Sequence, residues 1–203
     1  MSKREHIISK AIELFAEWGF DNTSIRAISQ KAGVNVAMIN YYFGSKEKLF
    51  EAIIDYKSSY LKSRLEELRA NLELNELDKI KIIIDEFTNR IMSNPKFHRI
   101  LHQELLLNTR PELNTIIRGL FQRNYSIIKS ILEDGIRKKL FRQVDADLTI
   151  ATVFGTINHL AQSANMLISG QDVSKEFQFD EPARQRLVSH LHNLMEAHLL
   201  NKA

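Results

Sequence analysis

The sequence contains no cysteine, and it has only three prolines and seven glycines among its 203 residues. The absence of cysteine excludes disulfide bonds, thiol catalysis and thiolate metal sites, and it fits a reducing compartment. The scarcity of proline and glycine indicates few turns and long secondary-structure elements. No stretch of six residues alternates apolar and polar side chains, so the pattern typical of half-buried β-strands is missing.

The sequence also lacks a long hydrophobic run. Its N-terminal segment is cationic, but Lys10, Glu13 and Glu17 interrupt the apolar residues. This argues against a signal peptide and a membrane-spanning helix, so we expect a cytoplasmic protein without a membrane partner. The net charge of +3 is small. Composition alone therefore does not indicate nucleic-acid binding, although phosphate contacts need only a few well-placed donors.

Apolar residues recur at spacings of three and four almost throughout the chain. This periodicity is typical of amphipathic helices, and it predicts an all-α fold of about nine helices. Gly19 is expected to end the first helix, and Thr23 to cap the second, with Ser24 as the alternative. A polar loop is expected over 170–181. The expected helices cover residues 3–18, 23–32, 34–43, 45–71, 76–93, 95–108, 110–139, 145–169 and 183–201.

Several spaced motifs fall within residues 3–50. A short helix runs into Gly33, and the next helix begins with small residues, which is the arrangement of a helix-turn-helix. The set closely resembles the N-terminal region of the TetR family of bacterial transcription regulators. The motifs are Ala11-x-x-Leu14-Phe15 with Gly19-Phe20, Thr23-Ser24-Ile25-x-x-Ile28 with Ala32-Gly33-Val34, and Tyr42-Phe43-x-Ser45-Lys46-x-x-Leu49.

The resemblance implies a domain organisation and a function. Residues 1–50 are expected to form a helix-turn-helix DNA-binding domain, and residues 51–203 a helical ligand-binding and dimerisation domain. The implied function is that of a DNA-binding transcriptional regulator, as a ligand-responsive homodimeric repressor on a palindromic operator. The alternative is a DNA-bound adaptor that recruits a protein partner without a small-molecule effector.

The resemblance also implies which residues touch DNA. The positions of Thr23, Tyr42 and Lys46 hold phosphates in such proteins, and a lysine at a helix N-terminus fits this role. Arg26 is placed to reach a guanine edge or a phosphate. The alternatives are that Arg26 and Lys46 are solvated surface residues. The candidates for the major groove are Asn35, Val36, Ala37, Met38, Asn40 and Tyr41.

Asn40 stands where most family members have tyrosine. Its amide can pair with adenine, so the operator preference of other members does not transfer to this chain. The alternative for Tyr41 and Tyr42 is that both rings cap the small core.

The rest of the chain is expected to hold a partner and an effector. The resemblance implies dimerisation through the last two helices, 145–169 and 183–201, and an unknown small-molecule effector among the middle helices. His98 and His102 stand at the i, i+4 spacing of a metal site, but only two ligands are visible, so we predict no metal and no cofactor. The alternative is a metal-responsive sensor that uses these two histidines. The apolar candidates for the effector pocket are Phe87, Ile91, Leu101, Leu105, Phe121, Tyr125 and Phe154.

Catalytic motifs are missing from the sequence. There is no glycine-rich phosphate loop and no G-x-S-x-G nucleophile turn. We therefore predict that the protein is not an enzyme.

Overall fold

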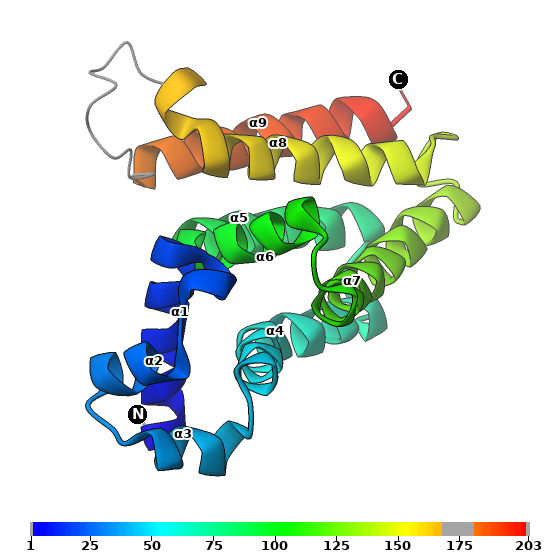
Figure 1. The fold of residues 1–203 in the computed structure, drawn as a ribbon. Coiled ribbons are helices and arrows are strands. Elements are labelled where there is room, and N and C mark those ends of the chain that lie inside the picture. Colours follow the sequence, from blue (N-terminus) through cyan, green and yellow to red (C-terminus); the bar gives the residue numbers. More distant parts are fainter. Residues whose placement is uncertain (1, 168–180, 202–203) are drawn as a thin grey trace. The chain divides into compact units, whose positions relative to one another are not determined.

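The computed structural model describes residues 2–167 and 181–201. Within these ranges all regular elements are α-helices, nine in number (Figure 1), which confirms the expected all-α fold. Most of the loop expected over residues 170–181 lies outside the described residues. The helices are α1 (Lys3–Asn22), α2 (Ile25–Ala32), α3 (Val36–Phe43), α4 (Lys46–Ala70), α5 (Glu76–Ser93), α6 (Pro95–Leu107), α7 (Pro111–Arg137), α8 (Ala146–Leu167) and α9 (Glu181–Leu199).

The junction between α1 and α2 differs from the expected capping. The backbone leaves the helical conformation at Gly19 (φ 77°), as expected, and a further turn extends to Asn22. Ser24 caps α2, because its Oγ accepts a hydrogen bond from the Ala27 N–H at 3.0 Å. The predicted Thr23 cap is therefore wrong, and the alternative, Ser24, is confirmed. The Thr23 hydroxyl instead turns inward and donates to the Gly19 carbonyl at 2.7 Å, one of the acceptors that the helix break leaves open.

The described chain packs as two compact units. The first contains the residues up to Tyr60 together with 96–121. Its core includes an aromatic cluster in which the Phe20 ring lies 5.2 Å from Phe15 and 5.4 Å from Phe50, centroid to centroid. Phe97 from α6 and Ile117 from α7 belong to the same core. The small helices α2 and α3 are therefore supported by α6 and the first part of α7, as a three-helix unit of this size requires.

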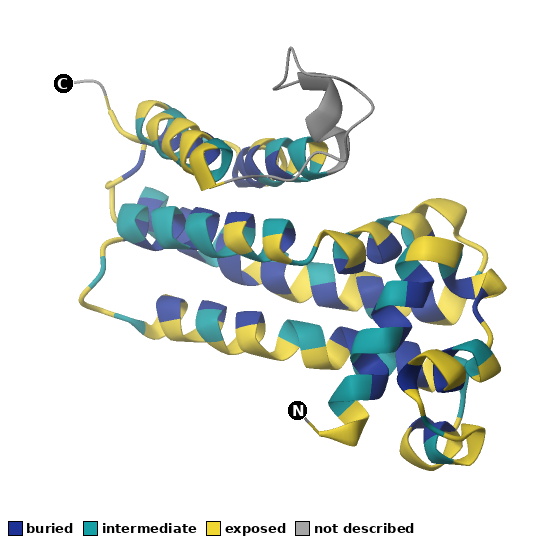
Figure 2. Ribbon diagram, turned by 90° about the vertical axis from the view of Figure 1, so that its left-hand side faces the viewer, coloured by how far each residue is buried: buried dark blue, intermediate teal, exposed yellow. Residues whose placement is uncertain are grey.

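The second unit contains 61–95 and the described residues from Gln122 onward. In it α5 contacts both α8 and α9, and the core is rich in isoleucine. Figure 2 shows the buried residues along the inner faces of the helices and the exposed ones outside. The expected functional boundary at residue 50 stays a prediction, because packing groups residues without regard to function. No described helix is both long and apolar enough to cross a membrane.

Gly135 in α7 marks a close approach within the second unit. A Cβ atom there would lie 2.2 Å from two atoms of the buried Phe141 ring. We expect Gly135→Ala to lower the free energy of unfolding by about 1–3 kcal/mol, because the added methyl overpacks the core. Urea unfolding measures this change. The control is Gly119→Ala in the same helix, where no atom lies within 4 Å and alanine should stabilise by about 0.5–1 kcal/mol. A similar response of the two variants would contradict the expectation.

Candidate nucleic-acid interface

A tight turn at Gly33 sets the direction of α3. Gly33 has a left-handed backbone (φ 63°), and its N–H donates to the Gln30 carbonyl at 3.2 Å. Glycine adopts this conformation without the steric penalty of a Cβ atom, so it suits the reversal after α2. Asn35 then caps α3, because its Oδ1 accepts from the Met38 N–H at 2.7 Å. Two eight-residue helices joined by such a turn form the helix-turn-helix arrangement.

α3 has one face in the core and one in solvent. Ile39 and Phe43 are buried in the core of the first unit, and Met38 packs partly against it. These residues hold α3 in place and leave its other face free to approach DNA. The predicted groove residues on the exposed face are Asn35, Val36, Ala37, Asn40 and Tyr41.

The two tyrosines at the end of α3 lie outside the core. Tyr41 is 85% exposed, so the alternative that its ring caps the core is wrong. Tyr42 is 38% exposed and lies edge-on to Tyr41, with 5.4 Å between ring centroids. The Tyr42 ring thus belongs to an aromatic pair at the surface, next to the exposed face of α3.

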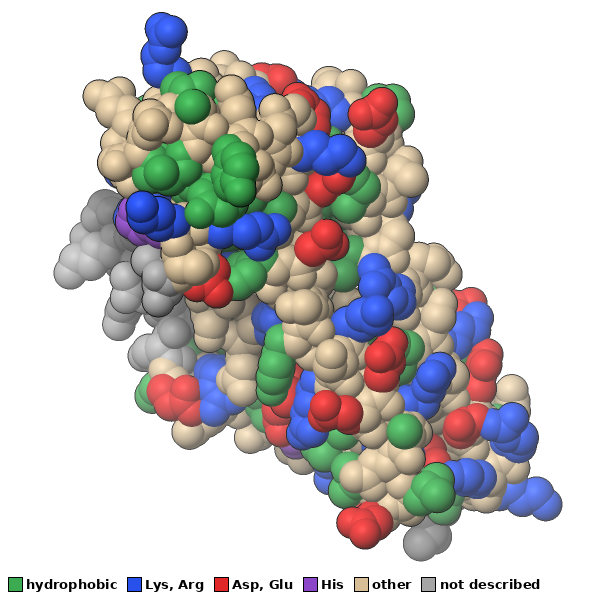
Figure 3. Space-filling model, turned by 90° about the horizontal axis from the view of Figure 1, so that it is seen from below, with side chains coloured by type: hydrophobic (Ala, Val, Ile, Leu, Met, Phe, Trp, Pro, Cys, Tyr) green, Lys and Arg blue, Asp and Glu red, His purple; other side chains and the backbone are tan. Residues whose placement is uncertain are grey.

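Basic residues flank this face. Arg26 is exposed on α2. Arg4, near the start of α1, lies over the Phe43 ring with its Cζ 5.4 Å from the centroid. In the view of Figure 3, Lys and Arg side chains are interspersed with Asp and Glu. Near α3, Arg4 and Arg26 are individual cations that can attract phosphate.

Two of the predicted phosphate contacts, Thr23 and Lys46, have hydrogen-bond partners within the chain. Thr23 is fully buried, and its hydroxyl donates to the carbonyls of Gly19 and Leu14, so it is not available to a phosphate. The Lys46 ammonium donates to the carbonyls of the α1–α2 turn. Sequence reasoning missed these internal hydrogen bonds, because the acceptors are backbone carbonyls, which leave no signal in side-chain patterns.

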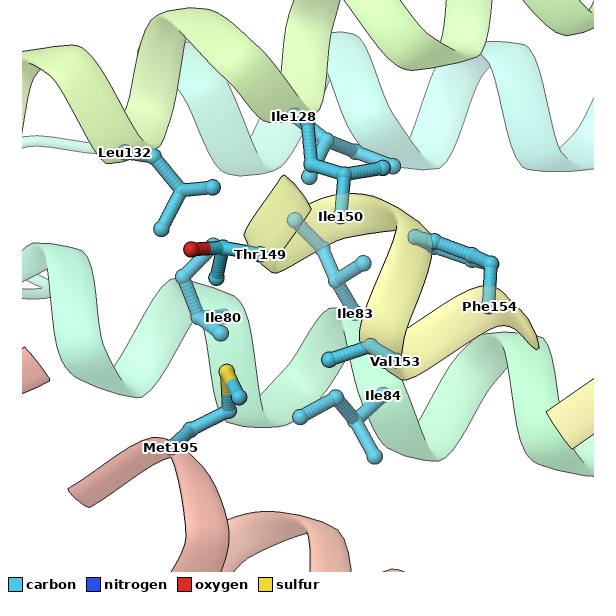
Figure 4. A pocket seen from close by; sticks show the side chains of 10 residues that line it. All are labelled: Ile80, Ile83, Ile84, Ile128, Leu132, Thr149, Ile150, Val153, Phe154 and Met195. Carbon is cyan, nitrogen blue, oxygen red and sulfur yellow. The ribbon is translucent and has the colours of Figure 1, made fainter. Parts of the chain in front are cut away.

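A small apolar cavity lies in the second unit, between α5, α7, α8 and α9 (Figure 4). Its volume is about 20 Å³, roughly the room of one water molecule. Figure 4 shows side chains from the four helices pointing toward one another around it. Its lining is Ile80, Ile83, Ile84, Ile128, Leu132, Thr149, Ile150, Val153, Phe154 and Met195.

The predicted pocket residues divide between the two units. Phe154 lines the cavity, and Phe87 lies edge-on to it at 4.5 Å between ring centroids. Ile91 is in the same core, and Tyr125 donates to the Asp147 carboxylate. The other three, Leu101, Leu105 and Phe121, pack in the core of the first unit. Sequence reasoning missed Ile80, Ile83 and Ile84, whose i, i+3, i+4 spacing on α5 was the available signal.

The histidines at the candidate metal spacing contact aromatic rings. The His98 ring lies 5.4 Å from Phe97, and the His102 ring 6.3 Å from Phe121, between centroids. Within the described residues no three His, Cys, Asp or Glu side chains gather as metal ligands would. The absence of a metal and of a cofactor remains a prediction.

Comparisons with known proteins agree with this geometry. Residues 7–53 match the protein family described as "Bacterial regulatory proteins, tetR family". Residues 73–162 match the family described as "Tetracyclin repressor-like, C-terminal domain". The chain is 32% identical over 143 residues to the transcriptional repressor NicS of Pseudomonas putida, covering 68% of this chain and 66% of that protein. It is 26% identical over 160 residues to the fatty acid metabolism regulator protein of Bacillus subtilis, covering 77% and 80%.

The fold also matches solved structures. One is the transcriptional regulator FadR of Bacillus subtilis in complex with stearoyl-CoA, with a TM-score of 0.70, 22% identity, and coverage of 92% of this chain and 96% of that one. The helix-turn-helix, the all-α fold and the two family matches agree. The chain belongs to the TetR family, and it is a DNA-binding transcriptional regulator.

Proposed function

We propose that this protein is a homodimeric, ligand-responsive repressor that binds a palindromic DNA operator. The observation that carries the proposal is the exposed face of α3, which the Gly33 turn presents beside Arg26. Asn40 is placed to pair with adenine, and the Ala37 methyl to meet a thymine methyl in the major groove. Tyr42 and Arg26 are the proposed phosphate contacts. Selection of duplexes from a random-sequence pool tests the proposal, which requires a palindromic consensus.

The exposed face of α8 is suited to form a dimer interface. Leu148 is 67% exposed on this helix, and the small residues Ala151, Thr152 and Gly155 follow on the same face. Small residues allow another helix to approach closely. Burial of the exposed Leu148 side chain in an interface would be favourable, because it removes apolar surface from water. Two recognition helices must also meet half-sites about one DNA turn apart, which a two-fold dimer provides. We propose that this face of α8, with α9, forms the interface.

The effector site we propose is the apolar cavity of the second unit. A cavity lined almost wholly by aliphatic side chains favours an aliphatic ligand, and at about 20 Å³ it must widen to admit one. The FadR structure with stearoyl-CoA supports an acyl chain as the class of ligand. Widening the cavity displaces α5, α7 or α8, and we propose that this favours a tilt of the continuous helix α4. A coupling of about 1–3 kcal/mol would change operator affinity by roughly 5- to 150-fold.

Stearoyl-CoA is expected to raise the thermal unfolding midpoint and to release a selected operator duplex. Ile84→Trp should abolish both effects, because the larger side chain fills the cavity. Leu72→Trp, at a position that is 93% exposed, is the matched control and should respond like the unaltered protein. Thermal shift and fluorescence anisotropy of labelled DNA measure the two effects. Stabilisation by stearoyl-CoA without release of DNA would contradict a ligand-responsive repressor, and no response to any acyl-CoA would favour the adaptor.

A further inference from the structure

The first residue of α4 lies against the turn that joins α1 to α2, within the first unit. The Lys46 Nζ donates to the carbonyl oxygens of Phe20 at 2.8 Å and Thr23 at 3.0 Å, and reaches that of Asp21 at 3.5 Å. Carbonyls at the end of a helix lack intrahelical donors and need others. Because an ammonium has three N–H donors, the contacts with this turn account for all of them.

The surroundings of Lys46 agree with a fixed position. Its Nζ also lies 4.4 Å from the centroid of the Phe20 ring, a distance typical of cation–π contacts. Lys46 is half-buried, and burial lowers the pKa of its ammonium, while the charges of Glu47 and Glu104 act in the opposite direction. A lysine that serves only as a solvated surface charge would not be held by a ring and by backbone carbonyls together.

A second cation holds the same turn. Arg110, in the connection between α6 and α7, forms an ion pair with the Asp21 carboxylate, and its Cζ lies 4.6 Å from the Phe20 ring centroid. Its Nη1 donates to Glu104 Oε2 at 2.6 Å. Glu104 is only 3% exposed, so little water screens this pair. The turn is thereby joined to α6 as well as to α4.

We infer that Lys46 and Arg110 are positioning residues for the DNA-reading helices, and that Lys46 makes no phosphate contact. This rests on the proposed DNA-binding function. The turn at 20–23 fixes where α2 begins, and α2 fixes α3 through the turn at Gly33. Two cations therefore set the place of the helix-turn-helix against α4 and α6 within the first unit. If the Lys46 donors stay on these carbonyls when DNA binds, Lys46 contacts no phosphate and adds nothing to the counterion release that phosphate contacts cause.

The test compares Lys46→Met and Arg110→Met with Lys48→Met. Lys48 is the control because it is on the same helix turn, has a side chain that is 65% exposed, and pairs only locally with Glu51 at 2.7 Å. Two quantities are measured: the dependence of DNA affinity on salt, with a duplex selected from a random pool by the unaltered protein, and the fluorescence of the DNA-free protein. Trp18 is the only tryptophan, and its carbonyl accepts from Asn22 Nδ2 at 3.0 Å beside the turn.

We expect Lys46→Met and Arg110→Met each to lower DNA affinity about tenfold, because part of the binding free energy is then spent on ordering the helix-turn-helix. The slope of log K against log salt concentration should stay unchanged in both variants. The emission of Trp18 should shift without DNA in both, because the turn moves, and should stay the same in Lys48→Met.

The opposite results overturn the inference. A salt slope smaller by about 0.9 in Lys46→Met, with Trp18 emission unchanged, would assign Lys46 to a phosphate. Unchanged emission in Arg110→Met would also refute a shared positioning role. If far-ultraviolet circular dichroism shows that Lys46→Met does not fold, the inference is tested on Arg110→Met by its salt slope and its Trp18 emission. If the unaltered protein selects no duplex, the proposed function fails, and the fluorescence comparison alone still decides whether the two cations hold the turn.

Discussion

Ala37→Glu is expected to lower operator affinity about a hundredfold, or about 2.8 kcal/mol, while the protein stays folded. Ala37 is exposed in the first turn of α3. A glutamate in the first turn of a helix interacts favourably with the helix dipole, so the substitution should not destabilise α3. On DNA, the same carboxylate would face the phosphate backbone and the acceptor groups of the major groove, and both repel it.

Two controls separate charge from bulk. Ala37→Gln adds a side chain of the same size without a charge, and we expect it to change the preferred base sequence more than the overall affinity. Ser126→Glu adds the same charge at an exposed position of α7 and should leave binding nearly unchanged. Fluorescence anisotropy with selected and random duplexes measures the affinities. Equal losses in Ala37→Glu and Ser126→Glu would mean that net charge, and not the position of α3, determines binding.

Gly155→Arg is expected to give a folded monomer whose operator affinity is lower by at least about a hundredfold, because the gain from binding two linked half-sites is lost. No atom of the described residues lies within 4 Å of the position that a Cβ atom would take at Gly155, so this part of the chain accommodates the larger residue. Glycine in a helix interior costs about 1 kcal/mol relative to alanine. Among the residues that the structure describes, none requires glycine here, and close approach of a second α8 supplies a reason for it.

The matched control is Gly119→Arg. Gly119 is also helical and exposed, and no atom lies within 4 Å of its Cβ position, so the two variants share the substitution and the local environment. Sedimentation velocity should show a dimer for Gly119→Arg and a monomer for Gly155→Arg. A dimeric Gly155→Arg protein would place the interface on another surface. Because arginine adds positive charge, weaker DNA binding by Gly155→Arg cannot arise from electrostatic repulsion.

The helices and the exposed face of α3 were predictable from the sequence. Helical periodicity and capping residues act over a few positions, so Gly19, Gly33 and the apolar spacing of α3 indicate the break, the turn and the buried side of each helix. The choice between Thr23 and Ser24 as a cap was not predictable in this way. Both residue types suit an N-cap, and only the helix break at Gly19 supplied the carbonyl that draws the Thr23 hydroxyl inward.

The sequence by itself therefore determined the all-α fold, the helix-turn-helix and membership of the TetR family, because these depend on local periodicity and on closely spaced motifs. Tertiary structure decided the rest. In the tertiary structure α6 packs in the same unit as the DNA-reading helices, and the apolar cavity has a volume of about 20 Å³. The Lys46 ammonium contacts a carbonyl 26 residues earlier in the chain. Such contacts depend on how distant helices pack. Every residue has a backbone carbonyl, so the type of a residue does not indicate whether its carbonyl binds a cation.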